Sequence, residues 1–165
     1  MNSEKVKIKG SWSGIGGLGN LAAVYNSEWG PYYKDRQVIE KAKDTLDEQA
    51  RNYIENGSLT IRENRWARSG HAMALPYTRM HEGFEKTGLL DETIEIDGKK
   101  GTRRDAYALM FKEEFDRFKN NRRLYTNQTV GSNAGLYYLN KALQQLKPEL
   151  AVSETKALRY VYELL

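Results

Sequence analysis

At 165 residues, of which 39% are hydrophobic, the chain is long enough to fold as one domain with a sizeable core, which excludes a disordered chain. The net charge of +4 at pH 7 is modest and its signs are mixed, so charge alone does not indicate a nucleic-acid-binding protein. The absence of cysteine excludes disulfide frameworks and thiolate metal sites, and no apolar run approaches the ~18 residues of a membrane span. We therefore expect a soluble intracellular protein with no membrane partner.

The first part of the chain predicts a strand, two loops and a long helix. Val6 and Ile8 alternate with lysines, which predicts a short strand over residues 5–9. We expect a flexible glycine-rich loop near residues 10–20, and the Gly30-Pro31 pair among aromatic residues predicts a second, structured loop. From Lys34 onward, apolar residues recur every three or four positions and predict a helix that ends at Gly57.

The middle of the chain contains a hairpin signal. Residues 58–74 show no dominant period, so their structure stays open. Residues 90–96 favour a strand, and Asp97-Gly98 supplies the two residues of a tight turn after it. We therefore predict a strand that ends in a hairpin turn.

The last part of the chain predicts helices. Aromatic residues at positions 107, 111, 115 and 118 predict one helix with Glu113 and Glu114 on its solvated side, although residues 106–111 also fit a strand. Asn133 is the expected N-cap of another helix, and Ser153 either caps a last helix or precedes a final strand. Since strands and helices do not alternate regularly, we predict a single α+β domain over residues 1–165, with a small antiparallel sheet packed against one long helix and two or three shorter ones.

The stretch "SGIGGLGN" places Gly14, Gly16 and Gly19 in the spacing of a dinucleotide-binding loop. A dinucleotide fold needs a strand that is buried on both faces before this loop, and the sequence has "KVKIK" there. No apolar strand precedes Asp35, the acidic residue at the right separation to hold a ribose. We interpret the stretch as a turning loop and expect no cofactor.

Candidate catalytic residues are few. His71 and His81 have the chemistry to bind a metal with Glu82 or Glu85, but their spacing matches no metal motif. Ser69 lies beside His71, but the nucleophile elbow G-x-S-x-G does not occur. We expect no catalytic, cofactor or metal site, and a small enzyme that uses these residues or the glycine loop remains an alternative.

Arginine groups and exposed aromatic side chains are better candidates for an interaction surface. Two arginine groups stand out, in "IRENRWAR" and "RFKNNRR", and an aromatic stretch covers residues 25–33. The candidate surface consists of Trp29, Tyr32, Tyr33, Arg62, Arg65, Arg68, Arg122 and Arg123. The same residues leave open an alternative function as a nucleic-acid-binding protein, regulatory or anti-defence in role.

Residues 65–96, "RWARSGHAMALPYTRMHEGFEKTGLLDETIEI", contain Trp66, a Leu75-Pro76 pair and Thr78, then Thr87-Gly88 before a strand with Leu90 and Ile94. This segment resembles the small neck proteins of tailed bacteriophages, the head-tail connector and tail-completion group. In that group an "LP" or "PL" turn precedes a Thr-Gly-x-Leu segment that opens a strand. We expect Thr87 to satisfy a free amide, Gly88 to allow entry into the strand, and Leu90 and Ile94 to be buried.

The resemblance implies a structural role in a virion rather than catalysis. It implies a ring of copies, with six-fold symmetry, between the portal or connector and the tail proteins. It also implies assembly in the host cytoplasm, location in the virion neck or tail, and contact with packaged DNA without base readout. Closed cyclic symmetry is the usual outcome for such joints, because head-to-tail contacts that do not close form filaments.

Overall fold

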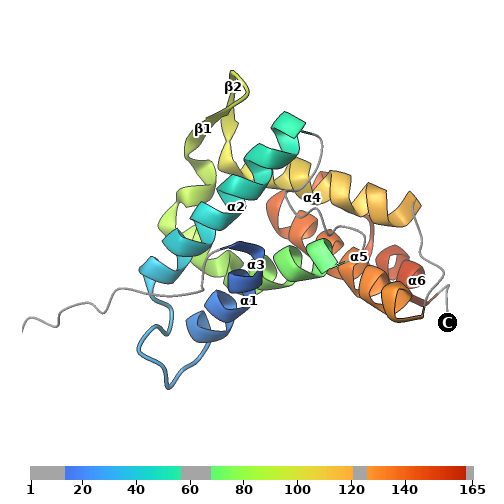
Figure 1. The fold of residues 1–165 in the computed structure, drawn as a ribbon, viewed down its shortest axis with the longest axis horizontal. Coiled ribbons are helices and arrows are strands. Elements are labelled where there is room, and N and C mark those ends of the chain that lie inside the picture. Colours follow the sequence, from blue (N-terminus) through green and yellow to red (C-terminus); the bar gives the residue numbers. More distant parts are fainter. Residues whose placement is uncertain (1–13, 57–67, 121–125, 163–165) are drawn as a thin grey trace, which may run out of the picture.

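The computed structural model describes residues 14–56, 68–120 and 126–162. Within them, two strands, β1 (Thr93–Ile96) and β2 (Lys99–Thr102), form one antiparallel sheet (Figure 1). The helices are α1 (Gly14–Tyr25), α2 (Arg36–Asn56), α3 (Arg68–Thr87), α4 (Arg103–Asn120), α5 (Thr126–Leu146) and α6 (Glu154–Tyr162). The expected antiparallel sheet is thus present, but the fold is dominated by helices. The predicted single long helix is wrong, because α2, α3, α4 and α5 each have 18–21 residues.

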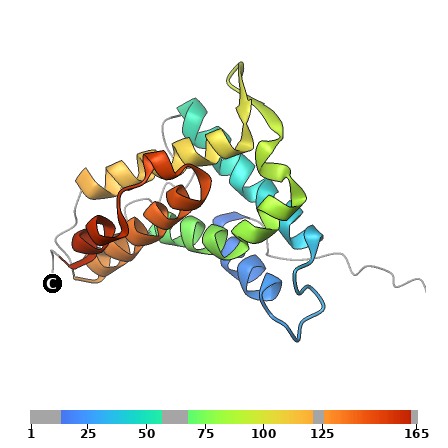
Figure 2. The same ribbon diagram turned by 180° about the vertical axis from the view of Figure 1, so that it is seen from behind.

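The helices pack around α3 and α5. Helix α3 contacts α1 and α5, while α5 also contacts α4 and α6, and α2 lies against α1 and α4 (Figures 1 and 2). Aromatic rings join α3 to α4: the Tyr77 ring centroid lies 5.4 Å from that of Phe111 and 6.3 Å from that of Tyr107. All three rings are buried, and aromatic pairs at such distances stabilise a core beyond the area that they bury.

The glycine-rich loop predicted near residues 10–20 is a helix from Gly14 onward. Helix α1 buries Leu18, Leu21, Ala22 and Tyr25, which lie on one helical face. Burial of this face outweighs the cost of about 1 kcal/mol that each glycine adds to a helix. Residues 10–13 and the strand expected over residues 5–9 lie outside the described residues.

The helix expected from Lys34 is confirmed as α2. Asp35 caps it, because its Oδ1 accepts a hydrogen bond of 2.8 Å from the backbone N–H of Gln37. The strand alternatives for residues 106–111 and for the C-terminal segment are wrong, since the described residues there belong to α4 and α6. Ser153 caps α6 as expected: its Oγ accepts a hydrogen bond from Lys156 N.

Two sequence-based predictions about polar side chains are wrong. Asn133 is not an N-cap, because α5 begins at Thr126 and Asn133 is buried inside it. Its Nδ2 donates a 2.9 Å hydrogen bond to the carbonyl of Val161 and so ties α5 to α6. Glu114 is not solvated: it is 1% exposed and pairs with Arg117 on the same helix. In both cases a protein partner replaces water for the buried polar side chain.

Candidate interaction surface

The hairpin of β1 and β2 has one apolar face. Asp97 and Gly98 form its turn with φ of 52° and 70°, the positive values that a type I′ turn requires, so the hairpin prediction is confirmed. Ile96 pairs with Lys99 and Ile94 pairs with Gly101. Because side chains alternate across a strand, Ile94 and Ile96 share one face, and Gly101 leaves a gap on that face opposite Ile94.

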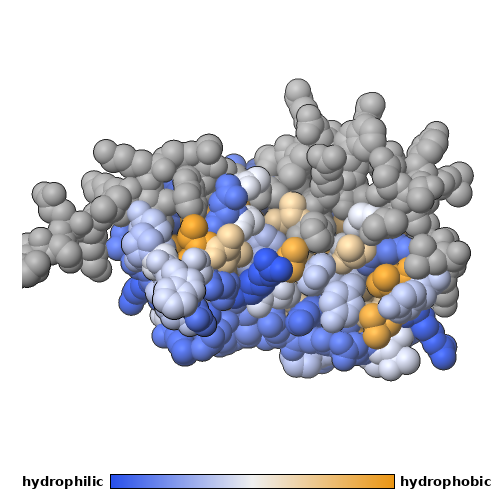
Figure 3. Space-filling model, turned by 90° about the horizontal axis from the view of Figure 1, so that it is seen from below, coloured by the Kyte–Doolittle hydropathy of each residue, from blue (hydrophilic) through white to orange (hydrophobic). Residues whose placement is uncertain are grey.

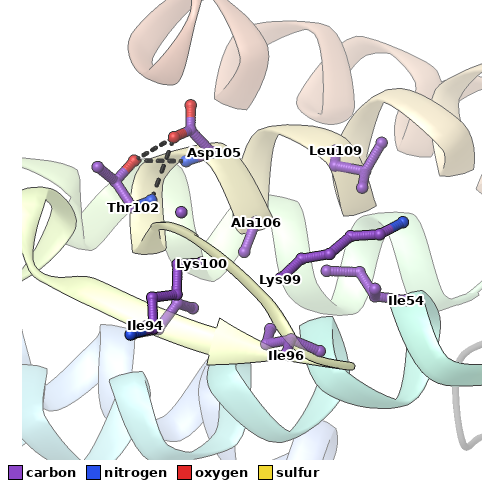
Figure 4. Close-up of a pocket in the computed structure, with 10 residues that line it drawn as sticks. Ile54, Ile94, Ile96, Lys99, Lys100, Thr102, Asp105, Ala106 and Leu109 are labelled. Atoms are coloured by element: carbon purple, nitrogen blue, oxygen red, sulfur yellow. Dashed lines mark hydrogen bonds between the residues drawn. The ribbon is translucent and has the colours of Figure 1, made fainter.

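A pocket of about 180 Å³ lies between this face and helices α2 and α4 (Figure 4). Its apolar lining combines Ile94 and Ile96 of the hairpin with Ile54 of α2 and Leu109 of α4. Leu109 is 44% exposed, so part of this apolar lining is in contact with water. The pocket is lined by Ile54, Ile94, Ile96, Lys99, Lys100, Gly101, Thr102, Asp105, Ala106 and Leu109.

Gly101 keeps this pocket open. Among the described residues, a Cβ built on Gly101 would meet Asp105 alone, at 3.8 Å from its Oδ2, which is an ordinary contact distance. The backbone of Gly101 does not have the positive φ that would demand glycine, unlike Gly88 and Gly98. A larger side chain is therefore sterically tolerated at position 101, and it would occupy the space between the hairpin and α4.

Two lysines border the pocket from β2. Lys99 and Lys100 are both exposed, and within the described residues neither forms an ion pair. Asp105, the acidic residue of the lining, is paired with Lys147, which directly follows α5, and bonded to Thr102. The hydrogen bond from Lys147, followed by that from Thr102, lowers the pKa of Asp105 from 3.8 to about 2. The edge of the pocket at Lys99 and Lys100 is thus positively charged.

Asp105 also joins the hairpin to α4. Thr102 Oγ1 accepts a hydrogen bond from Asp105 N, and Asp105 Oδ2 accepts one from Thr102 N, a reciprocal cap of the first turn of α4. These two hydrogen bonds fix the end of β2 relative to the first turn of α4. They therefore also set the width of the pocket between the hairpin and α4.

We expect Asp105→Asn to destabilise the protein in a pH-dependent way. Because the folded-state pKa lies below the unfolded value of 3.8, the stabilising contribution of the carboxylate is complete above pH 3.8 and is lost as the pH falls through about 2. The difference in unfolding free energy between wild type and variant should shrink over this window. Urea titrations at several pH values measure it, and Lys147→Met should give the same profile. A difference that is constant down to pH 2 would contradict this assignment.

Trp29 lies in the loop between α1 and α2 and is 97% exposed. The loop is held by hydrogen bonds from Lys34 N to Tyr25 O, from Gly30 N to Ser27 O, and from Asn26 Nδ2 to Arg79 O on α3. An indole on an ordered loop loses little conformational entropy when it binds a partner. Figure 3 shows that exposed apolar residues on this side of the molecule lie in small separate groups among hydrophilic ones.

The other predicted interaction residues are placed only in part. Tyr33 is exposed, but Tyr32 is half-buried and packs against the core. Arg68 begins α3, but its side chain is outside the description, and Arg62, Arg65, Arg122 and Arg123 lie outside the described residues altogether. Trp29 and Tyr33 are therefore the two predicted surface residues whose side chains the structure shows exposed to solvent.

The Thr87-Gly88 motif ends a helix rather than opening a strand directly. Gly88 has φ of 70°, a left-handed value that favours glycine, but it opens a short 3₁₀ turn and not the strand as predicted. Leu90 is buried in a short 3₁₀ turn before β1, and Ile94 is half-buried in β1. Thr87 does not satisfy an amide: its hydroxyl donates to the carbonyls of Gly83 and Phe84 at the end of α3. Leu75-Pro76, expected to turn, lies inside α3.

Of the candidate catalytic and metal-binding residues, the structure describes the side chains of His81, Glu82 and Glu85. His81 Nδ1 lies 2.9 Å from the hydroxyl of Tyr77, and burial, only partly offset by Glu85, lowers the pKa of the imidazole. In the part of the chain that the structure describes, no group of three or more His, Asp or Glu side chains is placed to hold a metal. The side chains of Ser69 and His71 are outside the description.

No protein-family model, no curated protein and no solved structure matches the chain. Among the described helices, none has the length and apolar character to cross a bilayer. The class of the protein is therefore given by its architecture, a helix-dominated α+β fold with a protruding hairpin.

Sequence reasoning missed the pocket. The turn at Asp97-Gly98 implies the pairing of Ile94 with Gly101, so the gap on the apolar face of the hairpin was readable from the sequence. The contributions of Ile54 and Leu109 were not, because they depend on how α2 and α4 pack around the hairpin.

Proposed function

We propose that the chain is a structural subunit that works by binding copies of itself and neighbouring proteins. The observation that carries this proposal is Trp29, an indole that is 97% exposed on a hydrogen-bonded loop. Tryptophan is the residue most enriched at the energetic centres of protein interfaces, and an exposed, ordered one has no role in stabilising its own fold.

We infer further that the assembly is the neck of a tailed bacteriophage or a related particle. The support is the resemblance of residues 65–96 to head-tail connector and tail-completion proteins. In this proposal the subunits form a closed ring, six-fold in symmetry, that binds a portal or connector protein on one side and tail proteins on the other. The protein then resides in the virion and catalyses no reaction.

The test is the size of the particles that the purified protein forms, alone and with its partners. We expect multi-subunit particles in sedimentation velocity, ring-shaped by electron microscopy, and a stable complex with the portal or tail protein encoded beside it. Trp29→Ala should weaken association at least about thirtyfold while leaving the melting temperature unchanged. A protein that stays monomeric and binds neither partner would refute the proposal.

Nucleic-acid binding is the alternative function. Within the described residues, Arg103, Arg104 and Arg117 are paired with carboxylates, so they offer little charge to phosphates. A steep loss of affinity for duplex or single-stranded DNA as salt is raised, with no protein partner found, would favour this alternative.

A further inference from the structure

We propose that Trp29 of one copy docks in the hairpin pocket of a second copy, with Glu28 of the first copy beside Lys99 and Lys100 of the second. The contact is head-to-tail. This inference rests on the proposed function, because it identifies the surfaces through which subunits of the assembly meet.

The pocket and the indole match in size and polarity. An apolar cavity of about 150 Å³ accepts a benzene ring. The hairpin pocket, at about 180 Å³, is somewhat larger, and it is open on one side, so a larger ring can project from it. Its lining of Ile54, Ile94, Ile96 and Leu109 provides apolar contact for an aromatic ring. The free protein leaves both partners in water, since Trp29 is exposed and Leu109 is partly so.

The charges beside the two elements are complementary. Glu28 precedes Trp29 and is exposed, and Lys99 and Lys100 stand at the edge of the pocket. None of these three charged side chains forms an ion pair within the described ranges. A carboxylate that approaches two unpaired ammonium groups favours encounter and fixes the orientation of the docked loop.

The two elements cannot meet within one chain. The hairpin and the loop between α1 and α2 lie at opposite ends of the molecule, as both ribbon views show (Figures 1 and 2). A contact between them must therefore join two copies, and the resulting pair keeps one unused indole on one copy and one unused pocket on the other. Repetition of such a contact produces a closed ring or a filament.

The experiment uses two variants that each remove one side of the contact. Trp29→Ala removes the indole and keeps the pocket. Gly101→Val fills the pocket with a β-branched residue that suits a strand, and it keeps the indole. We expect each variant alone to be monomeric in sedimentation velocity. An equimolar mixture should form heterodimers and nothing larger, because only one productive contact is possible in each pair.

Matched controls separate docking from folding. Glu95→Val adds the same side chain to the opposite, exposed face of the hairpin, and Tyr162→Ala removes another exposed aromatic side chain. Both controls should assemble as the wild type does. Gly101→Val should melt at or above the wild-type temperature, since it fills apolar space. If Gly101→Val unfolds the protein, Leu109→Glu replaces it as the pocket variant, because it puts a charge in the apolar lining.

Cross-linking tests the same contact directly, because the chain contains no cysteine. Mixed Glu28→Cys and Lys99→Cys variants should form a disulfide-linked heterodimer under mild oxidation. A Glu28→Cys and Lys156→Cys mixture, with the lysine on α6, should not exceed random collision.

The proposal is overturned if Trp29→Ala and Gly101→Val both assemble as the wild type does. It is also overturned if the cross-link between the Glu28→Cys and Lys99→Cys variants does not exceed its control. If assembly with copies or partners persists in either case, the proposed function stands and only this contact is refuted. If the wild type neither assembles nor binds a partner, the function proposed above is refuted as well.

Discussion

Replacement of Arg103 with alanine should lower the free energy of unfolding by about 2–4 kcal/mol, because the buried Leu89 carbonyl and the partly buried Asp47 carboxylate lose their donor. The Arg103 side chain is 6% exposed at the start of α4. Its Nε donates to both oxygens of Asp47 on α2, at 2.8 and 3.1 Å, and its Nη1 donates to the buried carbonyl of Leu89 and to Glu92. One side chain thus joins α2, α4 and the segment before the hairpin.

The cost arises mainly from the groups left behind. Asp47 would keep only its hydrogen bonds from neutral partners, such as the 2.7 Å bond from the Tyr107 hydroxyl, and the Leu89 carbonyl would lose its donor in the interior. An unsatisfied buried acceptor such as the Leu89 carbonyl costs about 1–3 kcal/mol, and the Asp47 carboxylate, 27% exposed, adds to this cost because water replaces the guanidinium only in part. Glu92 is half-exposed and contributes little, because water replaces its partner.

Urea denaturation of wild type, Arg103→Ala and Arg103→Lys measures the effect. Lysine keeps the charge but lacks the planar fork, so Arg103→Lys should fall between the other two. Arg36→Ala is the matched control, because Arg36 makes one exposed pair with Glu40 and its removal should cost no more than about 0.5 kcal/mol. Equal effects at positions 36 and 103 would show that the network does not stabilise the fold.

The sequence predicted those parts of the fold that depend on local patterns. The period of apolar residues identified α2 and α4, and the Asp97-Gly98 turn identified the hairpin. Helix α1 was missed because its four glycines argue locally for a loop, whereas the helix is stabilised by burial of Leu18 and Leu21 against other helices. Local propensity is a weak guide where tertiary packing decides.

Long-range partners explain the remaining differences. Arg103 is a charged residue that the pattern would place on the surface, and its burial depends on Asp47, 56 residues earlier in the chain. Asparagine is a residue type typical of helix N-caps, but the acceptor of the Asn133 side chain, the carbonyl of Val161, lies 28 residues later. For the candidate site, the sequence indicated Trp29 and Tyr33, which stand on a loop. It did not indicate the pocket, which three separate elements form together.

Gly83→Ala should destabilise the protein although alanine is the better helix former. Gly83 lies in α3, where this helix packs against Tyr25 of α1 and Ile39 of α2. A Cβ at this position would overlap the Tyr25 hydroxyl oxygen and lie 2.6 Å from Ile39 Cδ1, well below contact distance. Tyr25 and Ile39 are both buried, so neither side chain can move aside without displacing others. Overpacking of this kind costs about 1–3 kcal/mol.

The opposing gain in helix propensity is about 1 kcal/mol, so we expect a net loss in unfolding free energy of up to about 2 kcal/mol, and a larger loss for Gly83→Val. Gly19→Ala is the matched control. Gly19 is exposed in α1, and among the described residues nothing beyond its chain neighbours and its own helix backbone lies within 4 Å of the position that a Cβ would take, so this change should stabilise the protein by up to about 1 kcal/mol. Thermal and urea unfolding of the two alanine variants should therefore shift in opposite directions. A stabilising shift at both positions would mean that α3 does not approach Tyr25 and Ile39 closely enough to exclude a methyl group, and the packing of α1 and α2 on α3 would have to differ from that described.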